Sequence, residues 1–142
     1  MADFNLAIGK IFTAEGYIEG KNMGYVNHPA DRGGETIAGI ARNFWKNEPL
    51  WNIVDSAKKQ PNFPKSLLTN KQLAEMIRAF YKKNFWDKIG GDKIKSQNIA
   101  KELVDMAVNS GVSNGIKMAQ RVVGLPQTGI ANDLLIEKLN ML

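Results

Sequence analysis

Four carboxylates lie near the front of the chain, where a helical pattern gives way to a glycine-rich stretch. They are Glu15, Glu19, Asp31 and Glu35. Two carboxylates in unlike environments are the usual equipment for breaking a glycosidic bond. Glycines beside them let a bulky substrate approach the backbone closely. The pattern favours a carboxylate active site, and the alternative is that these groups are solvated, as most Glu residues at helix ends are.

Glu15 has the most suggestive position of the four. Apolar residues recur at helical spacing from Asp3 to Ala14, with Asp3 as the N-cap. Glu15 would then end this helix beside unpaired carbonyls, which carry a partial negative charge. That charge and partial burial would favour the protonated carboxyl, the form that a general acid needs. Asp31, on the following loop, could stay ionised and position a water molecule.

The composition limits the chemistry to carboxylates. The 142 residues fit one domain, and the 44% apolar and 23% charged shares are those of a soluble globular protein. The chain has no cysteine and one histidine, His28. Disulfides, iron–sulfur clusters and cysteine nucleophiles are therefore excluded, and a histidine metal site or Ser–His–Asp triad is disfavoured. We expect no metal and no organic cofactor.

The net charge of +5 indicates an acidic partner, which could be nucleic acid, an anionic membrane surface or bacterial cell wall. The basic residues are scattered, and Lys58-Lys59 and Lys82-Lys83 are expected to be solvated helix faces. The chain has no apolar run near the ~20 residues of a membrane span, and its start does not resemble a secretory signal. We expect no stable membrane insertion.

The predicted fold is mostly α-helical, with a loop or short, irregular hairpin around Tyr25-Val26-Asn27 after the first helix. Later helices are expected over residues 37–47, 50–59, 97–109, 114–123 and 132–139, and from a capping box at Thr69-x-x-Gln72 onwards. The helix over 97–109, with Ser96 as its expected cap, is apolar on most sides, which is typical of a buried central helix. Asp105 and Asn109 lie on its narrow polar stripe, where they either satisfy neighbouring backbone groups or form the floor of a cleft.

The front motif resembles that of glycoside hydrolase family 108, whose pattern reads E-G-G-Y-V-N-x-P-x-D-x-G-G-x-T-x-x-G-I. The matching residues are Glu15-Gly16, Gly24-Tyr25-Val26-Asn27-His28-Pro29-Ala30-Asp31-Arg32-Gly33-Gly34-Glu35-Thr36 and Gly39-Ile40. Three later segments are similar to its predicted peptidoglycan-binding part: residues 81–87, 105–111 and 120–124. The resemblance extends from Phe4 to the last helix. One departure is an insertion of seven residues, Tyr17 to Met23, between Glu15-Gly16 and Gly24-Tyr25.

The resemblance implies a lysozyme-like fold and acid–base hydrolysis without a metal. Glu15 would donate a proton to the leaving glycosidic oxygen, with Glu19 as the second candidate acid. Asp31 and Thr36 would bind the attacking water in an inverting reaction, which requires carboxyl groups ~6.5–9.5 Å apart. The substrate-binding residues would be Tyr25, Asn27, Asp105 and Asn109.

The sequence therefore predicts an N-acetylmuramidase of the endolysin kind that cleaves peptidoglycan glycan strands. The alternative is a catalytically inactive peptidoglycan-binding or secretion-accessory module; a nucleic-acid binder ranks last because it has only the charge in its favour. We expect a monomeric, lysozyme-like domain over residues 1–142, with a catalytic motif half (1–64) and a helical peptidoglycan-binding half (65–142). It would stay in the cytoplasm of the producing cell until release through a membrane pore.

Overall fold

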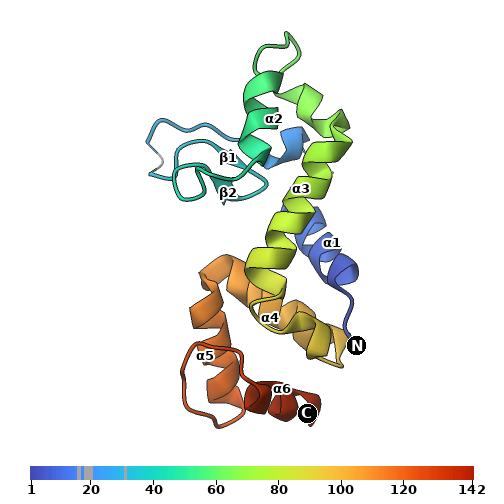
Figure 1. Ribbon diagram of the computed structural model, residues 1–142, viewed down its shortest axis with the longest axis vertical. Helices are drawn as coiled ribbons and strands as arrows, with labels where there is room; N and C mark the ends of the chain where they lie inside the picture. Colours follow the sequence, from blue (N-terminus) through green and yellow to red (C-terminus); the bar gives the residue numbers. More distant parts are fainter. Residues whose placement is uncertain (16, 18–20, 31) are drawn as a thin grey trace. The chain divides into compact units, whose positions relative to one another are not determined.

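A computed structural model describes residues 1–15, 17, 21–30 and 32–142 of the chain. The structure is mostly helical, with a short antiparallel hairpin after the first helix (Figure 1). This confirms the predicted fold class. The chain forms two compact units, one of Lys10–Arg78 and one of Met1–Gly9 with Ala79–Leu142. The division into a catalytic half (1–64) and a peptidoglycan-binding half (65–142) concerns function rather than these units, and it stays a prediction.

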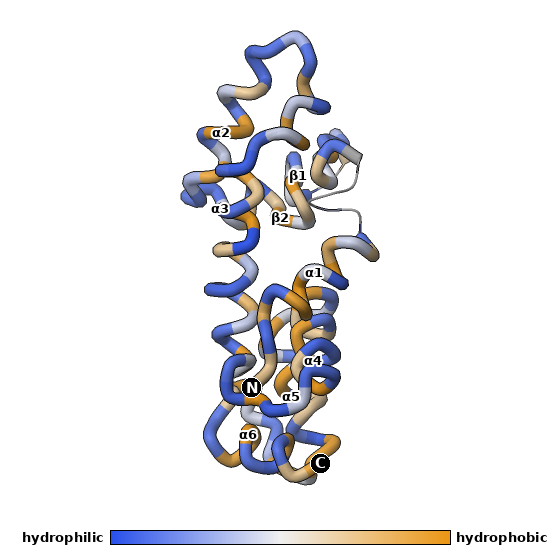
Figure 2. The backbone as a smooth tube through the Cα atoms, turned by 90° about the vertical axis from the view of Figure 1, so that its right-hand side faces the viewer, coloured by the Kyte–Doolittle hydropathy of each residue, from blue (hydrophilic) through white to orange (hydrophobic). Residues whose placement is uncertain are grey.

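The first helix, α1 (Phe4–Glu15), forms as its sequence predicts. The Asp3 carboxylate caps it by accepting a hydrogen bond from the Leu6 N–H at 3.1 Å. Hydrophobic and hydrophilic residues alternate along the helix (Figure 2). The predicted apolar positions are all buried: Phe4, Ala7, Ile8, Ile11 and Phe12.

The unit of Lys10–Arg78 contains the hairpin, in which β1 (Thr36–Ile37) pairs with β2 (Ile40–Ala41). The predicted helix over residues 37–47 is therefore wrong. Ala38 and Gly39 lie between the strands with φ of 48° and 79°, a conformation that turns the chain back and cannot continue a right-handed helix. Turns follow as far as Asn47.

The same unit continues with a 3₁₀ turn η1 (Lys21–Gly24), helix α2 (Leu50–Ala57), a second 3₁₀ turn η2 (Lys65–Thr69) and most of α3 (Lys71–Tyr81). The predicted capping box at Thr69 is wrong by one residue. The Asn70 side chain accepts from the Leu73 N–H at 2.9 Å, whereas the Thr69 hydroxyl donates to the Ser66 carbonyl. Asn caps helices as well as Thr does or better, and here it has the fitting position.

The other unit contains a π-helical turn η3 (Lys82–Trp86), a 3₁₀ turn η4 (Gly91–Lys93) and helices α4 (Gln97–Ser110), α5 (Val112–Val122) and α6 (Asp133–Asn140). Ser96 caps α4, as predicted. α4 and α5 pack so closely that a Cβ on Gly115 of α5 would lie only 3.1 Å from the backbone nitrogen of Ala107 in α4. α4 buries one face, consisting of Ala100, Leu103, Val104 and Ala107, rather than most of its circumference.

Trp86 is the centre of this unit's core. Its side chain is 0% exposed, its indole N–H donates to the Asp92 carboxylate at 2.8 Å, and the Phe4 ring meets it edge-on at 5.6 Å. Within the described residues, we find no helix with the length and apolar character that crossing a membrane requires.

Replacement by alanine should have opposite effects on stability at two glycines of this unit. A Cβ at Gly91 would overlap the Trp86 indole, so Gly91→Ala should destabilise the fold by about 1–3 kcal/mol through overpacking. Gly9 lies in α1 with open space where its Cβ would be, so Gly9→Ala should stabilise it by about 0.5–1 kcal/mol. Urea unfolding of both variants tests this packing, and a stable Gly91→Ala protein would contradict it.

Candidate active site

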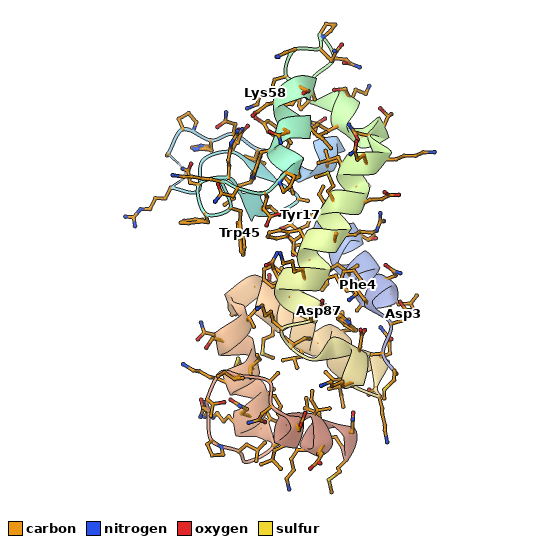
Figure 3. All side chains as sticks on the ribbon, in the orientation of Figure 1. Asp3, Phe4, Tyr17, Trp45, Lys58 and Asp87 are labelled. Carbon is orange, nitrogen blue, oxygen red and sulfur yellow. The ribbon has the colours of Figure 1, made fainter. Side chains whose placement is uncertain are left out.

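Glu15 is the last residue of α1, as predicted, but its side chain is exposed. The partial burial that would favour its protonated form is therefore absent. Tyr17 lies close enough to respond to its charge: burial, and then the negative charge of Glu15, raise the pKa of the Tyr17 phenol. The Tyr17 ring packs at 6.1 Å from that of Phe12, and Figure 3 labels it. Glu15 is therefore open to solvent, and its charge acts on the nearby Tyr17 phenol.

Thr36 is half-buried on β1 and is held by its backbone. Its carbonyl accepts from the Val26 N–H at 3.0 Å, and its N–H donates to the Val26 carbonyl at 2.7 Å. This isolated bridge places Thr36 directly opposite the segment Tyr25-Val26-Asn27. Three of the predicted site residues therefore come together in one small β-structure.

The two other predicted carboxylates of the site, Glu19 and Asp31, lie outside the described residues. Their roles, and the separation of Asp31 from Glu15, stay predictions. Asn27 is exposed. His28 is exposed too, and its Nδ1 accepts a local hydrogen bond from the Ala30 N–H at 3.3 Å. That contact is typical of a turn residue.

The two ends of the inserted segment, Tyr17 and Met23, make contacts with the motif. A Cβ on Gly24 would lie 3.0 Å from the Tyr17 ring and 3.4 Å from the Ala38 backbone, so only glycine fits here without strain. Gly24 also has a φ of 68°, which favours glycine. At the other end Met23 is buried, with a left-handed φ of 57°, and its carbonyl accepts from the Ala38 N–H.

A buried carboxylate connects this β-structure to α2. Glu35 is only 8% exposed, although most glutamates in proteins lie at the surface. Its oxygens accept from the Tyr25 hydroxyl at 2.7 Å, from Arg42 Nη1 at 2.6 Å and from Lys58 Nζ at 2.7 Å. Arg42 also forms a bidentate salt bridge with Asp55, in which Nη1 and Nη2 donate to the two carboxylate oxygens at 2.6 and 2.8 Å. We call these five residues the Glu35 cluster.

The cluster keeps its acidic members ionised. Burial by itself raises the pKa of Glu35, but the hydrogen bonds from Lys58, Tyr25 and Arg42 outweigh burial and leave that pKa below its usual value. The hydrogen bonds from Arg42 are the main cause that lowers the pKa of Asp55 to about 2. Burial and the neighbouring Glu35 raise the pKa of the Tyr25 phenol. Glu35 therefore has no proton to donate at neutral pH.

Sequence reasoning found only part of this cluster. It named Glu35 among the front carboxylates and Tyr25 as a substrate ligand, but it missed Arg42 and Asp55. Lys58 was expected to be merely solvated, whereas its ammonium group bonds to Glu35 and lies 3.4 Å from Asp55. The i, i+3 spacing of Asp55 and Lys58 on a predicted helix was the available signal.

Asp105 and Asn109 belong to α4, in the other unit. The Asn109 amide donates to the Asp105 carboxylate at 3.3 Å, so the two side chains bond to each other one turn apart. Asp105 is half-buried and Asn109 is exposed. Their predicted part in substrate binding stays a prediction.

The described part of the chain contains no group of three or more histidine, aspartate or glutamate side chains placed to hold a metal ion. The carboxylate, hydroxyl and amide side chains of the motif can transfer protons, form hydrogen bonds and stabilise charge.

Comparisons with known proteins identify a similar fold and the family of the chain. The chain is similar in fold to a solved structure of SagA from Brucella abortus, with a TM-score of 0.61 and 24% sequence identity. The match covers 98% of this chain and 69% of SagA. A search of curated proteins finds no significant match. The sequence model described as Glycosyl hydrolase 108 matches residues 8–111, a range that contains the whole front motif. This protein therefore belongs to glycoside hydrolase family 108.

Proposed function

We propose that this protein is a peptidoglycan hydrolase that cleaves glycan strands as an N-acetylmuramidase. The observation that carries the proposal is the family match over residues 8–111, which includes Glu15, Asp31 and Thr36. A glycoside hydrolase family implies a glycan substrate. The net charge of +5 suits an anionic cell-wall polymer.

In the proposed reaction, Glu15 donates its proton to the glycosidic oxygen as the bond from that oxygen to the anomeric carbon breaks. Asp31 accepts a proton from a water molecule whose oxygen attacks the anomeric carbon from the opposite face. The Thr36 hydroxyl holds this water. The products are a new reducing end and a free sugar hydroxyl, with inversion at the anomeric carbon.

The described contacts support these roles in different degrees. The exposed Glu15 is open to a polymer, and the paired backbone bonds of Thr36 keep its position constant, as water positioning requires. The exposed Asn27 amide can bond to sugar hydroxyl or acetamido groups. The Tyr25 hydroxyl is already engaged by Glu35, so we assign Tyr25 a supporting role and its ring, rather than its hydroxyl, to any sugar contact.

One observation favours a second function, a wall-binding or secretion-accessory module without hydrolysis. A general acid that works near neutral pH is usually half-buried, because an apolar surrounding favours its protonated form. Glu15 is exposed. This module would sediment with insoluble peptidoglycan and release no reducing ends, whereas the hydrolase would do both.

The proposal predicts that Glu15→Gln abolishes lysis. Removing the general acid should lower the rate of turbidity loss of bacterial cell walls by about 10²-fold or more, with an unchanged far-UV spectrum. Glu75→Gln is the matched control, because Glu75 is an exposed carboxylate of the same unit, on α3, that forms no ion pair with another described residue.

Full lysis by Glu15→Gln would overturn the assignment of the acid. Lysis that is lost only in Glu19→Gln would move that role to Glu19. If the wild type releases reducing ends and both Glu15→Gln and Glu19→Gln keep full lysis, neither carboxylate takes part in the reaction.

A second prediction concerns the water-binding hydroxyl. Thr36→Val keeps the shape and the β-branching of the side chain but removes the hydroxyl, so the strand should stay paired. We expect kcat to fall on the order of 10- to 100-fold, while the fraction of protein that sediments with peptidoglycan stays the same. A Thr36→Val enzyme with wild-type kcat would show that the hydroxyl does not hold the water.

A further inference from the structure

We infer that Glu35 is a positioning residue, whose carboxylate holds Thr36 and the segment Tyr25–Asn27 in the arrangement that the reaction needs. This inference rests on the proposed function only for the catalytic role of Thr36. The structural part, that Glu35 holds this β-structure in place, can be tested without measuring hydrolysis.

The position of Glu35 in the chain makes it suitable for this task. It directly precedes Thr36, and its carboxylate is bonded by donors from three separate segments: the loop that carries Tyr25, the turn after β2 that carries Arg42, and the last turn of α2 beside Lys58. Its backbone is fixed as well, because the Glu35 carbonyl accepts from the Arg42 N–H at 2.9 Å.

The buried state of the carboxylate gives these bonds their strength. An ionised group taken out of water must be paired and hydrogen-bonded, or its burial is strongly unfavourable. Glu35 satisfies this condition only while Tyr25, Arg42 and Lys58 stay where they are. The segment with Tyr25 and the strand with Thr36 are therefore held against α2 by one charge, in addition to the two backbone bonds between Val26 and Thr36.

Glu35 cannot replace Glu15 as the acid. Its oxygens already accept hydrogen bonds from Tyr25, Arg42 and Lys58, and it stays ionised at neutral pH. It acts through its neighbours, which is why it is a positioning residue rather than a catalytic one.

Loss of the charge should loosen this region without unfolding the unit. In Glu35→Gln, the Arg42 guanidinium keeps its two-pronged pair with Asp55, and Lys58 keeps its contact with Asp55 at 3.4 Å. The Tyr25 hydroxyl loses its strongest acceptor. We expect the bridge between Val26 and Thr36 to open more often, while the helices keep their stability.

The holding effect should also weaken in acid. Glu35 and Asp55 both have pKa values below their ordinary ones, so their contribution to stability is present above those ordinary values and is lost as the pH falls through the lowered ones. The charged groups that face Glu35 are Arg42 and Lys58, and the Tyr25 hydroxyl donates to it. Protection of the Thr36 amide should therefore fall in the wild type as the pH drops below the ordinary pKa of a glutamate, and should fall less in Glu35→Gln, which keeps only the contribution of Asp55.

The decisive experiment is hydrogen exchange by NMR on full-length wild type, Glu35→Gln and the control Glu75→Gln, combined with release of reducing ends from peptidoglycan. In Glu35→Gln, exchange of the Val26 and Thr36 amides should accelerate by about tenfold or more, with the Val104 and Ala107 amides of α4 unchanged. The kcat should fall about tenfold or more, with unchanged sedimentation with peptidoglycan. Glu75→Gln should match wild type in both measurements.

The two measurements separate failure of this inference from failure of the proposed function. Faster exchange at Val26 and Thr36 in Glu35→Gln, together with a wild-type protein that releases no reducing ends, would support the role of Glu35 and overturn the hydrolase. Unchanged exchange in Glu35→Gln would overturn the role of Glu35, whatever the activity. Faster exchange with unchanged kcat would show that Glu35 holds the strand but does not position the reaction.

A milder variant covers the case in which Glu35→Gln does not fold. Lys58→Met removes one of the three donors at a position that is 36% exposed, so the fold should tolerate it. Exchange at Val26 and Thr36 should again accelerate, by less than in Glu35→Gln. No acceleration in a folded Lys58→Met protein would contradict the inference.

Discussion

The ionised carboxylate of Glu35, buried among a phenol, a guanidinium and an ammonium group, is the interaction on which the rest of the motif-bearing unit depends. A buried charge is tolerated only with complete pairing, so its three partners are constrained as strictly as Glu35 itself. Those partners come from a loop, a turn and a helix. The short β-structure is too small to be stable by its own few hydrogen bonds, and this cluster gives it an anchor on α2.

The glycine-rich part of the motif has a related explanation. Gly24 has a left-handed backbone and accepts the Tyr17 ring at a distance that leaves no room for a Cβ, and Gly39 closes the tight turn of the hairpin. At the two ends of the insertion, the Tyr17 ring packs against Gly24 and the Met23 carbonyl accepts from the Ala38 N–H of the hairpin turn. These contacts connect Tyr17 and Met23 to the motif, close in sequence to the proposed acid Glu15.

Local signals in the sequence predicted much of the fold, whereas the charge network could not be predicted. Asp3 and Ser96 cap their helices as expected, because a cap depends on residues only three positions apart. The helix predicted over 37–47 failed because Ala38 and Gly39 take a left-handed turn that the apolar spacing does not reveal. The pairing of Glu35 with Lys58 spans 23 residues, and only tertiary structure brings such groups together. The exposure of Glu15 likewise depends on packing, which helical periodicity does not determine.

The central claim, that the carboxylates of this motif cleave glycan strands at muramic acid, is tested most directly by the identity of the new chain ends. Purified peptidoglycan is digested with the wild-type protein and reduced with borohydride, and the terminal sugar is identified by mass spectrometry. The account predicts N-acetylmuramitol at the new ends. N-acetylglucosaminitol would contradict the muramidase assignment, and the absence of any new reduced end would contradict hydrolysis itself.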